Sequence, residues 1–512
     1  MSLTGWYRRL LGRKPGRRVE VSAARPIRAR YDAAQTTDDN SQHWALVDSY
    51  DADSANSLTV RSTLRKRSRH ELENNGHGKG IELTQANYVV GRGPKLRMQT
   101  TNKAFNAAVE AAWNRWWKRV KGSRKLRTAV KAKVKSGEGF LVAKQNPGLR
   151  DQVKLDIVGI ECDQFTTPQL PYNEPNRIDG IKFDEFGNPL YYDLLTYHPG
   201  SGWSGLLDQP QQVDARYVFH LFREDRPGQH RGIPEVTSTL GLFAAARRFR
   251  EATIAAAETA ADHAALLYAD APASEEPDEM RPFSTMPIEK RMLTMMPYKW
   301  RMEQLRAEHP ATTYPEFNRI NTGEEARPLS MSYNIAACDS SGYSFSGGKL
   351  DHLTYFVSVD VEQADIEDLL LDPLFELWFE EAVLEYRGVP GWAISADVGS
   401  DHGWDWPARP QIDEQKTASA RETNLGTGVA SLRRIYAEDG YDFEDELPAM
   451  AEDYGKTPEE MREALFQKHF AAKAPESKPT PEDTDDGEDK PPPRNNGNGR
   501  TAKANGHGRV LV

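Results

Sequence analysis

The chain has 512 residues, of which 38% are hydrophobic and 28% charged, and its formal net charge is −10. This balance argues against a protein that grips nucleic acid tightly, because tight binding needs a dense field of lysine and arginine facing the phosphates. The two cysteines, Cys162 and Cys338, lie far apart in sequence and indicate neither a disulfide framework nor a thiolate zinc site. No apolar run approaches the roughly 18 residues needed to span a bilayer, so we expect no membrane segment.

The first 30 residues form a basic arm in which Glu20 is the only acid. The arm either contacts DNA or an acidic scaffold or shell protein, or is a disordered, solvated tail. It lacks the apolar region that is typical of a signal peptide. A helix is predicted over residues 54–75, beginning at Ser54 or Ser57. We expect its exposed face to carry four basic residues, Arg61, Arg65, Lys66 and Arg69.

Residues 104–135 predict two helices with a break near Lys121-Gly122-Ser123. Five apolar residues of the first helix recur at helical spacing and are expected to pack in a core or an interface: Phe105, Val109, Trp113, Trp116 and Trp117. Residues 115–135 contain ten basic residues and no acidic one. This run is either a solvated face or a contact with a neighbouring subunit or DNA.

Short alternating runs in the following part of the chain predict antiparallel strands. These runs are residues 139–145, 153–160, 177–184, 189–197 and 216–222. Turn-forming residues stand between them, at 146–148 and 184–188. Helices and antiparallel strands together predict an α+β body.

A long alanine-rich helix is predicted from Phe243 to Tyr268. It follows a loop that carries four turn-forming residues, Pro227, Gly228, Gly232 and Pro234. Along the helix, alanine recurs at every fourth position, at Ala252, Ala256, Ala260 and Ala264. Stacked small side chains on one face let another helix approach closely. The alternative interpretation is an ordinary alanine-rich core helix.

Residues 271–315 are rich in proline, glutamate and methionine, including Met286, Met292, Met295 and Met296. Methionine suits irregular packing and adaptable surfaces. The segment is therefore predicted either to dock partners or to form a loosely packed β-hairpin loop. The chain should then return through a second elongated element over 316–338 to a Ser/Gly-rich loop over 339–350.

The C-terminal part begins with a long helical pattern from Leu350 to Tyr386, which we expect to kink at Pro373. Residues 411–470 predict short acidic helices. One of them begins at Thr457-Pro458, where threonine caps the helix and proline stands in its first turn. Residues 471–512 have the composition of a disordered tail.

The sequence offers no set of catalytic residues. It contains no G-x-x-x-x-G-K-[ST] phosphate loop, no H-E-x-x-H zinc motif and no G-x-S-x-G nucleophile elbow. Adjacent acids such as Glu380 and Glu381 point to different faces of a helix and cannot flank one bond. We therefore predict no catalytic residue, no cofactor and no metal site.

Several segments together carry a family resemblance: ARYDAA (29–34), LRKRSRHELENN (64–75), YVVGRG (88–93), SGEGF (136–140), VGIECDQFTTP (158–168), IDGIKFDEFGNPLYYDLLTYHPG (178–200), RPGQHRGIP (226–234) and residues 404–446. In this order and spacing the chain resembles the portal proteins of lambda-like tailed phages, over roughly residues 29–455. It departs from the family pattern at residues 342–349, GYSFSGGK, and lacks an expected turn glycine at 291–300.

The resemblance implies an α+β portal fold with a defined division of the chain. After a basic arm over 1–30, the implied regions are a wing (31–240), a stem helix (241–270), a clip (271–315), a returning stem (316–338), a tunnel loop (339–350), a long kinked helix with the return to the wing (351–410), a helical crown-like region (411–470) and a disordered tail (471–512).

A portal of this family would be a ring of about twelve copies at one vertex of a phage capsid. The ring would nucleate head assembly, dock the terminase large subunit, and let double-stranded DNA enter the head and later leave through the tail. Further implied partners are the major capsid and scaffold proteins and the head–tail connector, without any membrane. The implied location is the virion, and the host cytoplasm during assembly.

Position in the family also assigns roles to residues. The implied tunnel loop holds six DNA-channel candidates: Ser340, Ser341, Tyr343, Ser344, Ser346 and Lys349. Lys349 is the one cation among them and a candidate phosphate contact. The four alanines at 252–264 would pack the stem helix between subunits, and the four methionines at 286–296 would dock the motor and the connector. The alternative for the loop is an ordinary Ser/Gly surface loop.

Two other classes of function stay open. One is a non-viral ring scaffold or adaptor, and the other is an enzyme that processes polysaccharide or nucleic acid with acidic pairs and exposed tryptophans. The missing catalytic set counts against the enzyme. The net negative charge suits a conduit, because strong phosphate contacts would act as a brake on moving DNA.

Overall fold

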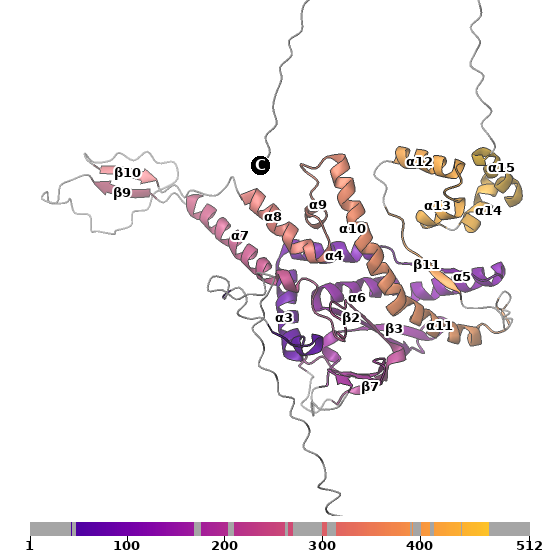
Figure 1. Ribbon diagram of the computed structural model, residues 1–512, viewed down its shortest axis with the longest axis horizontal. Helices are drawn as coiled ribbons and strands as arrows, with labels where there is room; N and C mark the ends of the chain where they lie inside the picture. Colours follow the sequence, from indigo (N-terminus) through magenta and orange to yellow (C-terminus); the bar gives the residue numbers. More distant parts are fainter. Residues whose placement is uncertain are drawn as a thin grey trace, which may run out of the picture. The chain divides into compact units, whose positions relative to one another are not determined.

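The computed structural model describes residues 42, 48–167, 176–202, 209–261, 265–269, 300–304, 314–389, 392, 401–409, 414–441 and 443–470. The chain divides into two units, Met1–Ile412 and Asp413–Val512. The described residues form helices and antiparallel sheets, which confirms the α+β class (Figure 1). The predicted basic arm and C-terminal tail lie outside the described residues. Within the described ranges, no helix combines the length and the apolar content that a membrane crossing requires.

Four helices carry much of the core of the larger unit: α3 (Leu58–Asn74), α4 (Gly76–Val89), α5 (Lys103–Arg119) and α6 (Gly122–Ser136), after the short α2 (Ala52–Ala55). The predicted start at Ser57 is confirmed as the position before α3. Asn75 both ends α3 and begins α4, because its backbone N–H donates to the Glu71 carbonyl while its side-chain oxygen accepts the His77 N–H at 3.0 Å. Lys121, at φ 57°, forms the predicted break between α5 and α6.

The predicted core face of α5 is confirmed. Its five apolar residues are buried: Phe105, Val109, Trp113, Trp116 and Trp117. The Trp113 ring lies 5.2 Å from the Trp378 ring of α11 (Asp372–Glu385), edge to face, a favourable geometry for aromatic quadrupoles. The Trp116 indole N–H donates to the Leu155 carbonyl at 2.7 Å, so the α5 face is fixed both by packing and by a buried hydrogen bond.

Two antiparallel sheets follow in the larger unit (Figure 1). The first has the strand order β3-β2-β8, made of β2 (Glu138–Gln145), β3 (Leu155–Ile160) and β8 (Val218–Phe222). The second has the order β4-β5-β6-β7, made of β4 (Arg177–Ile178), β5 (Ile181–Phe183), β6 (Pro189–Leu194) and β7 (Gln211–Asp214). Phe140 of β2 stacks on Phe165 at 4.1 Å within a small apolar cluster that joins both sheets.

A further sheet beside α5 is formed by two strands that are far apart in sequence. Strand β1 (Lys95–Met98) pairs antiparallel with β11 (His402–Asp405), so that Leu96 lies opposite Trp404. The chain thus returns near residue 400 to the strand that precedes α5.

The alanine-rich segment forms helix α7 over Leu240–Ala261, and helix α8 (Tyr314–Ala326) packs against it (Figure 1). The predicted continuation of the helix to Tyr268 is wrong. Residues Ala265–Ala269 form strand β9, which pairs antiparallel with β10 (Trp300–Gln304). The apolar run Leu266-Leu267-Tyr268 suits a strand, and its cross-strand pairing overrides the helical pattern that alanine suggests. Apart from strand β10 and the first two residues of α8, Tyr314 and Pro315, the predicted clip lies outside the described residues.

The long helical pattern near residue 350 is confirmed, but helix α10 (Phe345–Ile366) begins before the predicted loop 339–350 ends. The reason is local, because the Ser344 hydroxyl accepts the Gly347 N–H at 3.1 Å and caps the helix. The short α9 (Tyr333–Ala337) precedes this segment. A π-helical turn over Glu367–Leu371 joins α10 to α11, and Pro373 stands in the first turn of α11, where its missing N–H is tolerated.

In the smaller unit the described residues, 414–441 and 443–470, form four short helices: α12 (Glu414–Gly426), α13 (Leu432–Glu438), α14 (Phe443–Asp453) and α15 (Pro458–Phe470). Four buried side chains form its core, Phe443, Leu447, Ala451 and Met461. The predicted start at Thr457 is confirmed as a capping box. The Thr457 N–H donates to Glu460 Oε2 at 2.9 Å, and the Glu460 N–H donates to Thr457 Oγ1 at 3.3 Å.

Two glycines allow the beginning of β2 to lie against the loop before α7. A Cβ added to Gly137 would lie 2.4 Å from the Ile233 carbonyl carbon, and one added to Gly232 would lie 2.2 Å from the Gly137 oxygen. Gly137 also has φ +88°, a left-handed conformation that glycine adopts without a steric penalty. The backbones therefore meet directly, and no other residue type fits between them.

Replacing Gly137 by alanine should destabilise the fold more than the matched change Gly187→Ala. Both glycines have φ +88°, but nothing lies within 4 Å of a Cβ at Gly187. We expect Gly187→Ala to lower the free energy of unfolding by about 1 kcal/mol through backbone strain alone. Gly137→Ala should lower it by roughly 1–3 kcal/mol more, because the Ile233 backbone must move. Urea unfolding of both variants measures the difference, and equal losses would contradict the close approach.

Candidate channel segment and its buried support

Helices α7 and α8 pack against each other and precede the candidate channel segment, residues 340–349. The Phe249 ring lies 4.5 Å from the Phe317 ring, and Arg250 Nε donates to Asn318 Oδ1 at 3.2 Å across the pair. On α7, Ala252 is exposed and Ala256 half-buried. Ala260 lies in the last turn of the helix, and Ala264 lies outside the described residues. The docking candidates Met286, Met292, Met295 and Met296 also lie outside them.

The six channel candidates divide between a turn and a helix. Four of them, Ser340, Ser341, Tyr343 and Ser344, lie in the turn that precedes α10. Gly342 enables this turn, since it has φ +80°. The other two, Ser346 and Lys349, lie in the first turns of α10 and are exposed. The structure thus brings all six together at the beginning of α10, but only the first four are part of a loop.

The turn is attached to α8 through aromatic contacts. The Arg319 guanidinium lies 5.1 Å from the Tyr343 ring and 5.4 Å from the Tyr333 ring. The Tyr333 hydroxyl donates to Asp339 Oδ2 at 3.3 Å, and the Ser341 N–H donates to Asp339 Oδ1 at 2.9 Å. Hydrogen bonds from Ser341 hold the pKa of Asp339 below its usual value. Asp339 therefore stays ionised and keeps the turn closed.

A buried ion pair supports the loop that leads into α7. Arg231, fully buried, donates from Nε to Glu138 Oε1 at 2.6 Å and from Nη2 to Glu138 Oε2 at 2.9 Å. The Gly232 N–H adds a bond to Glu138 Oε1 at 2.9 Å. Burial alone would raise the pKa of Glu138, but Arg231 and Arg65 hold that pKa well below its usual range. The carboxylate is therefore charged, and it joins the first residue of β2 to the loop.

The prediction that Arg61 and Arg65 lie on an exposed face of the helix is wrong. Both are buried, because their guanidinium groups bond to partners distant in sequence. Arg65 pairs with Glu138, and Arg61 pairs with Asp179. Lys66 is exposed as predicted, and Arg69 is half-buried. Arg61 and Arg65 are four residues apart and do share one face of α3, but that face is turned toward the body of the protein.

A second polar cluster lies between α7 and α8 and is incompletely paired. Glu325 of α8 is fully buried, and among the described residues neither of its carboxylate oxygens has a hydrogen-bond partner. Arg250 of α7 likewise has a buried Nη2 without a partner there. Burial raises the pKa of Glu325 to about 7, although Arg250 acts in the opposite direction. The side chain thus changes charge near neutral pH.

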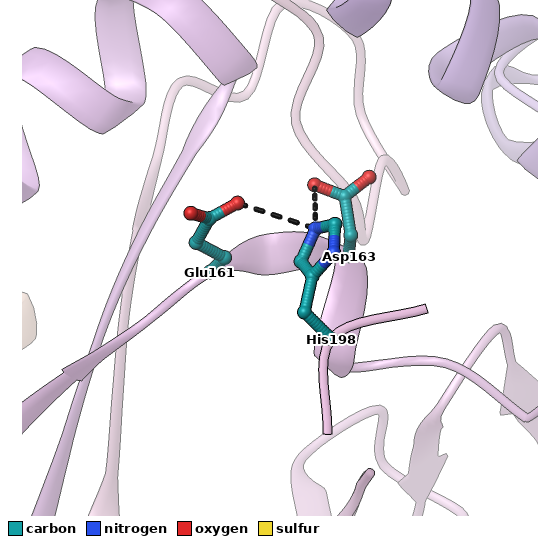
Figure 2. Close-up of side chains that lie close together, drawn as sticks. All are labelled: Glu161, Asp163 and His198. Carbon is teal, nitrogen blue, oxygen red and sulfur yellow. Dashed lines mark ion pairs between the residues drawn. The ribbon is translucent and has the colours of Figure 1, made fainter. Parts of the chain in front are cut away.

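Figure 2 shows the group of side chains that most resembles a metal site. His198 Nε2 lies 3.3 Å from Glu161 Oε2 and 3.7 Å from Asp163 Oδ2. However, His198 Nδ1 accepts the Gly200 N–H at 2.9 Å, so the ring proton is on Nε2 and that nitrogen has no lone pair for a metal. Arg69 also pairs with Asp163. We therefore interpret the group as an ion-pair cluster, in which the imidazole N–H and the guanidinium face two carboxylates.

Sequence reasoning missed Glu138 and Arg231 as a pair, because the two residues are 93 positions apart in the chain. Each stands beside glycines in a segment that carries the family resemblance, SGEG and HRGIP, but neither segment marks the other as its partner. The proximity of Glu161, Asp163 and His198 was missed for the same reason, since it depends on how the second sheet folds back.

Replacing Glu325 by glutamine should stabilise the protein at alkaline pH and leave it unchanged at acidic pH. Because the pKa of about 7 exceeds the ordinary value of 4.5, the folded state binds the proton more tightly than the unfolded state. Stability from this group is therefore present below pH 4.5 and is lost as pH rises through about 7. Above that pH we expect Glu325→Gln to gain about 1–3 kcal/mol.

Urea unfolding at both ends of this pH range measures the effect. The matched control is Glu324→Gln, since Glu324 is exposed on the same helix. The control should shift stability equally at both pH values. A pH-independent effect of Glu325→Gln would contradict the buried, unpaired carboxyl.

The chain is similar to known proteins in sequence. A profile of the family described as "Phage portal protein, lambda family" matches residues 39–363. The "Probable portal protein" of Halomonas phage phiHAP-1 is 25% identical over 422 residues, which cover 76% of this chain and 80% of the relative.

Solved structures of particle necks are also similar, with low TM-scores. A chain of "Neck of empty GTA particle computed with C6 symmetry" is 12% identical with a TM-score of 0.43, covering 74% of this chain and 93% of the other. A chain of "Virion of native gene transfer agent (GTA) particle" is 11% identical with a TM-score of 0.36, at the same coverage of 74% and 93%. The family match, which spans well over half of the sequence and includes α7, α8 and the candidate channel segment, carries the assignment: the chain belongs to the lambda family of phage portal proteins.

Proposed function

We propose that about twelve copies of this chain form a ring at one capsid vertex, through which double-stranded DNA is packaged and later ejected. Membership of the portal family carries this proposal. The match extends from residue 39 to residue 363 and so takes in α7, α8, the candidate channel segment and most of α10, which are the parts expected to build a channel. The ring would nucleate head assembly, in the host cytoplasm, and remain in the virion.

The energy for DNA movement would come from a partner. We assign this chain no catalytic residue and no cofactor, and expect the terminase large subunit to supply ATP hydrolysis. The methionines at 286–296 remain the proposed docking residues for that motor and for the head–tail connector. The major capsid and scaffold proteins are the proposed partners of the remaining outer surface.

The candidate channel segment has the chemistry of a weak DNA contact. It exposes serine hydroxyls and one cation, Lys349. A lysine ammonium contacts phosphate as a point charge, without the bidentate geometry of arginine. One such contact per copy is screened by salt and breaks easily, which suits DNA that must move in both directions. The attachment of Tyr343 to Arg319 would transmit force on the turn to α8.

Electron microscopy with mass determination on the purified full-length chain tests the ring. We expect rings with a central hole and about twelvefold symmetry. If the isolated chain stays small, the same measurement is made with scaffold and shell proteins present, and failure to form rings there would contradict the proposal. Co-assembly with capsid and terminase separates a portal from a non-viral ring adaptor, which would form rings without them.

Lys349→Ala should leave ring assembly intact and weaken the retention of packaged DNA. The expected loss is severalfold in the amount of nuclease-protected DNA at low salt, and it should shrink at high salt because the contact is electrostatic. The matched control is Lys66→Ala, which removes an exposed lysine of α3. Equal retention by the two variants would remove Lys349 from the proposed DNA contact.

A further inference from the structure

Helix α10 is apolar on two opposite faces, and the residues that the structure describes cover only one of them. Tyr355, Val359 and Ile366 are buried, and the Tyr355 hydroxyl donates to Gln85 of α4 at 2.6 Å. The other face carries four large aliphatic side chains at helical spacing, which we name the outer stripe: Leu350, Leu353, Val357 and Val361. Their exposed fractions are 64%, 53%, 65% and 57%. A helix that is apolar all round is normally buried all round.

Helix α8 presents a matching concave surface. An open groove of ≈ 510 Å³ runs along it, lined by Ile320, Gly323 and Tyr333 together with charged side chains that include Arg319 and Arg327. Ile320 is 55% exposed, and Gly323 leaves room for an incoming side chain because nothing lies closer to its Cβ position than 3.9 Å. We name this surface the α8 groove.

The two surfaces complement each other through their apolar side chains. The outer stripe presents four aliphatic side chains, and the α8 groove offers Ile320, the open space beside Gly323 and the Tyr333 ring. The charges of the groove balance, because Glu316 and Glu324 line it together with Arg319 and Arg327, and Asp360 of α10 is already paired with Arg409. Burial of apolar area would therefore drive the contact.

One chain cannot bring its own two surfaces together. Helices α8 and α10 both pack on α4 through their buried faces, with α9 between them (Figure 1). Both the outer stripe and the α8 groove lie on the faces turned away from α4, since helical spacing places them opposite the buried residues of each helix. The occupant that fits is a second copy of this chain.

We propose that the outer stripe of one copy docks in the α8 groove of the next, and that this contact builds the ring. The contact joins two different surfaces, so it repeats head to tail and closes when the rotation allows it. The inference rests on the proposed ring and adds to it the residues that meet across each interface.

Cysteine pairing between separate chains tests the contact directly. In a Cys338→Ser background, Leu353→Cys and Ile320→Cys are co-expressed as two chains and treated with a short bismaleimide. Cys162 is buried and should stay silent. We expect covalent dimers from the mixture and none from either variant alone. The matched control is Leu353→Cys with Phe186→Cys, because Phe186 is 82% exposed on the turn between β5 and β6 and lies outside both surfaces.

An assembly measurement completes the test. Val357→Asp should raise the concentration needed for ring formation at least tenfold, whereas Phe186→Asp should leave it unchanged, and thermal unfolding confirms that both variants are folded. Wild-type rings with no cross-link and normal assembly of Val357→Asp would overturn the inference and leave the ring intact. The same result is expected if another segment of the same chain covers the stripe. Absence of rings from the wild type, even with scaffold and shell proteins, would instead overturn the proposed function.

Discussion

The buried contact between Arg231 and Glu138 holds the loop before the long helix α7 against the beginning of the first sheet. Glu138 is the first residue of β2, and Arg231 lies in the loop that leads into α7. Removing Glu138 would take a carboxylate partner from two buried arginines, Arg231 and Arg65, and breaking a buried ion pair in this way costs about 3–5 kcal/mol. The glycines beside both residues let the two backbones touch, so the pair cannot loosen without opening the sheet. In the RPGQHRGIP segment, Arg231 supplies the buried charge and the adjacent Gly232 allows the close backbone approach, so the contact needs both residues together.

The opposite situation holds between α7 and α8. There, Arg250 and Glu325 approach without pairing, and the cluster retains polar atoms that its described neighbours do not satisfy. Buried polar groups that lack partners favour rearrangement, because a second arrangement can satisfy them better. The loop before α7 is thus held rigidly to the sheet, whereas the contact between the two helices is adjustable. In the proposed ring, the helices would keep this attachment while their mutual packing shifts.

Local patterns in the sequence were sufficient wherever a nearby residue decides the structure. The tryptophan spacing of α5, the break at Lys121 and the capping box at Thr457 each follow from a few neighbouring residues. The early start of α10 is an exception, because the sequence analysis placed it at Leu350 although the Ser344 cap is local and recognisable.

The errors arose where a distant partner decides. Arg65 is buried because Glu138 reaches it, and residues 265–269 form a strand because residues 300–304 lie beside them. Lys133 shows the same effect inside a basic run that a solvated face would explain. It is buried and held at 3.2 Å from Glu235, and Glu362 is its second partner. Tertiary pairing of this kind has no local signature.

In an ordinary monomer arginines are mostly exposed and large aliphatic side chains mostly buried, and this protein departs from both rules. Three arginines are fully buried while four aliphatic residues of α10 are exposed. The interior charges fix one conformation of the loop before α7, and the exterior apolar residues are free to associate. Association through apolar area depends little on salt, whereas a phosphate contact at Lys349 weakens as ionic strength rises. The two tasks of a portal, holding its subunits together and holding DNA, would therefore depend on different forces, so that a ring could release DNA without coming apart.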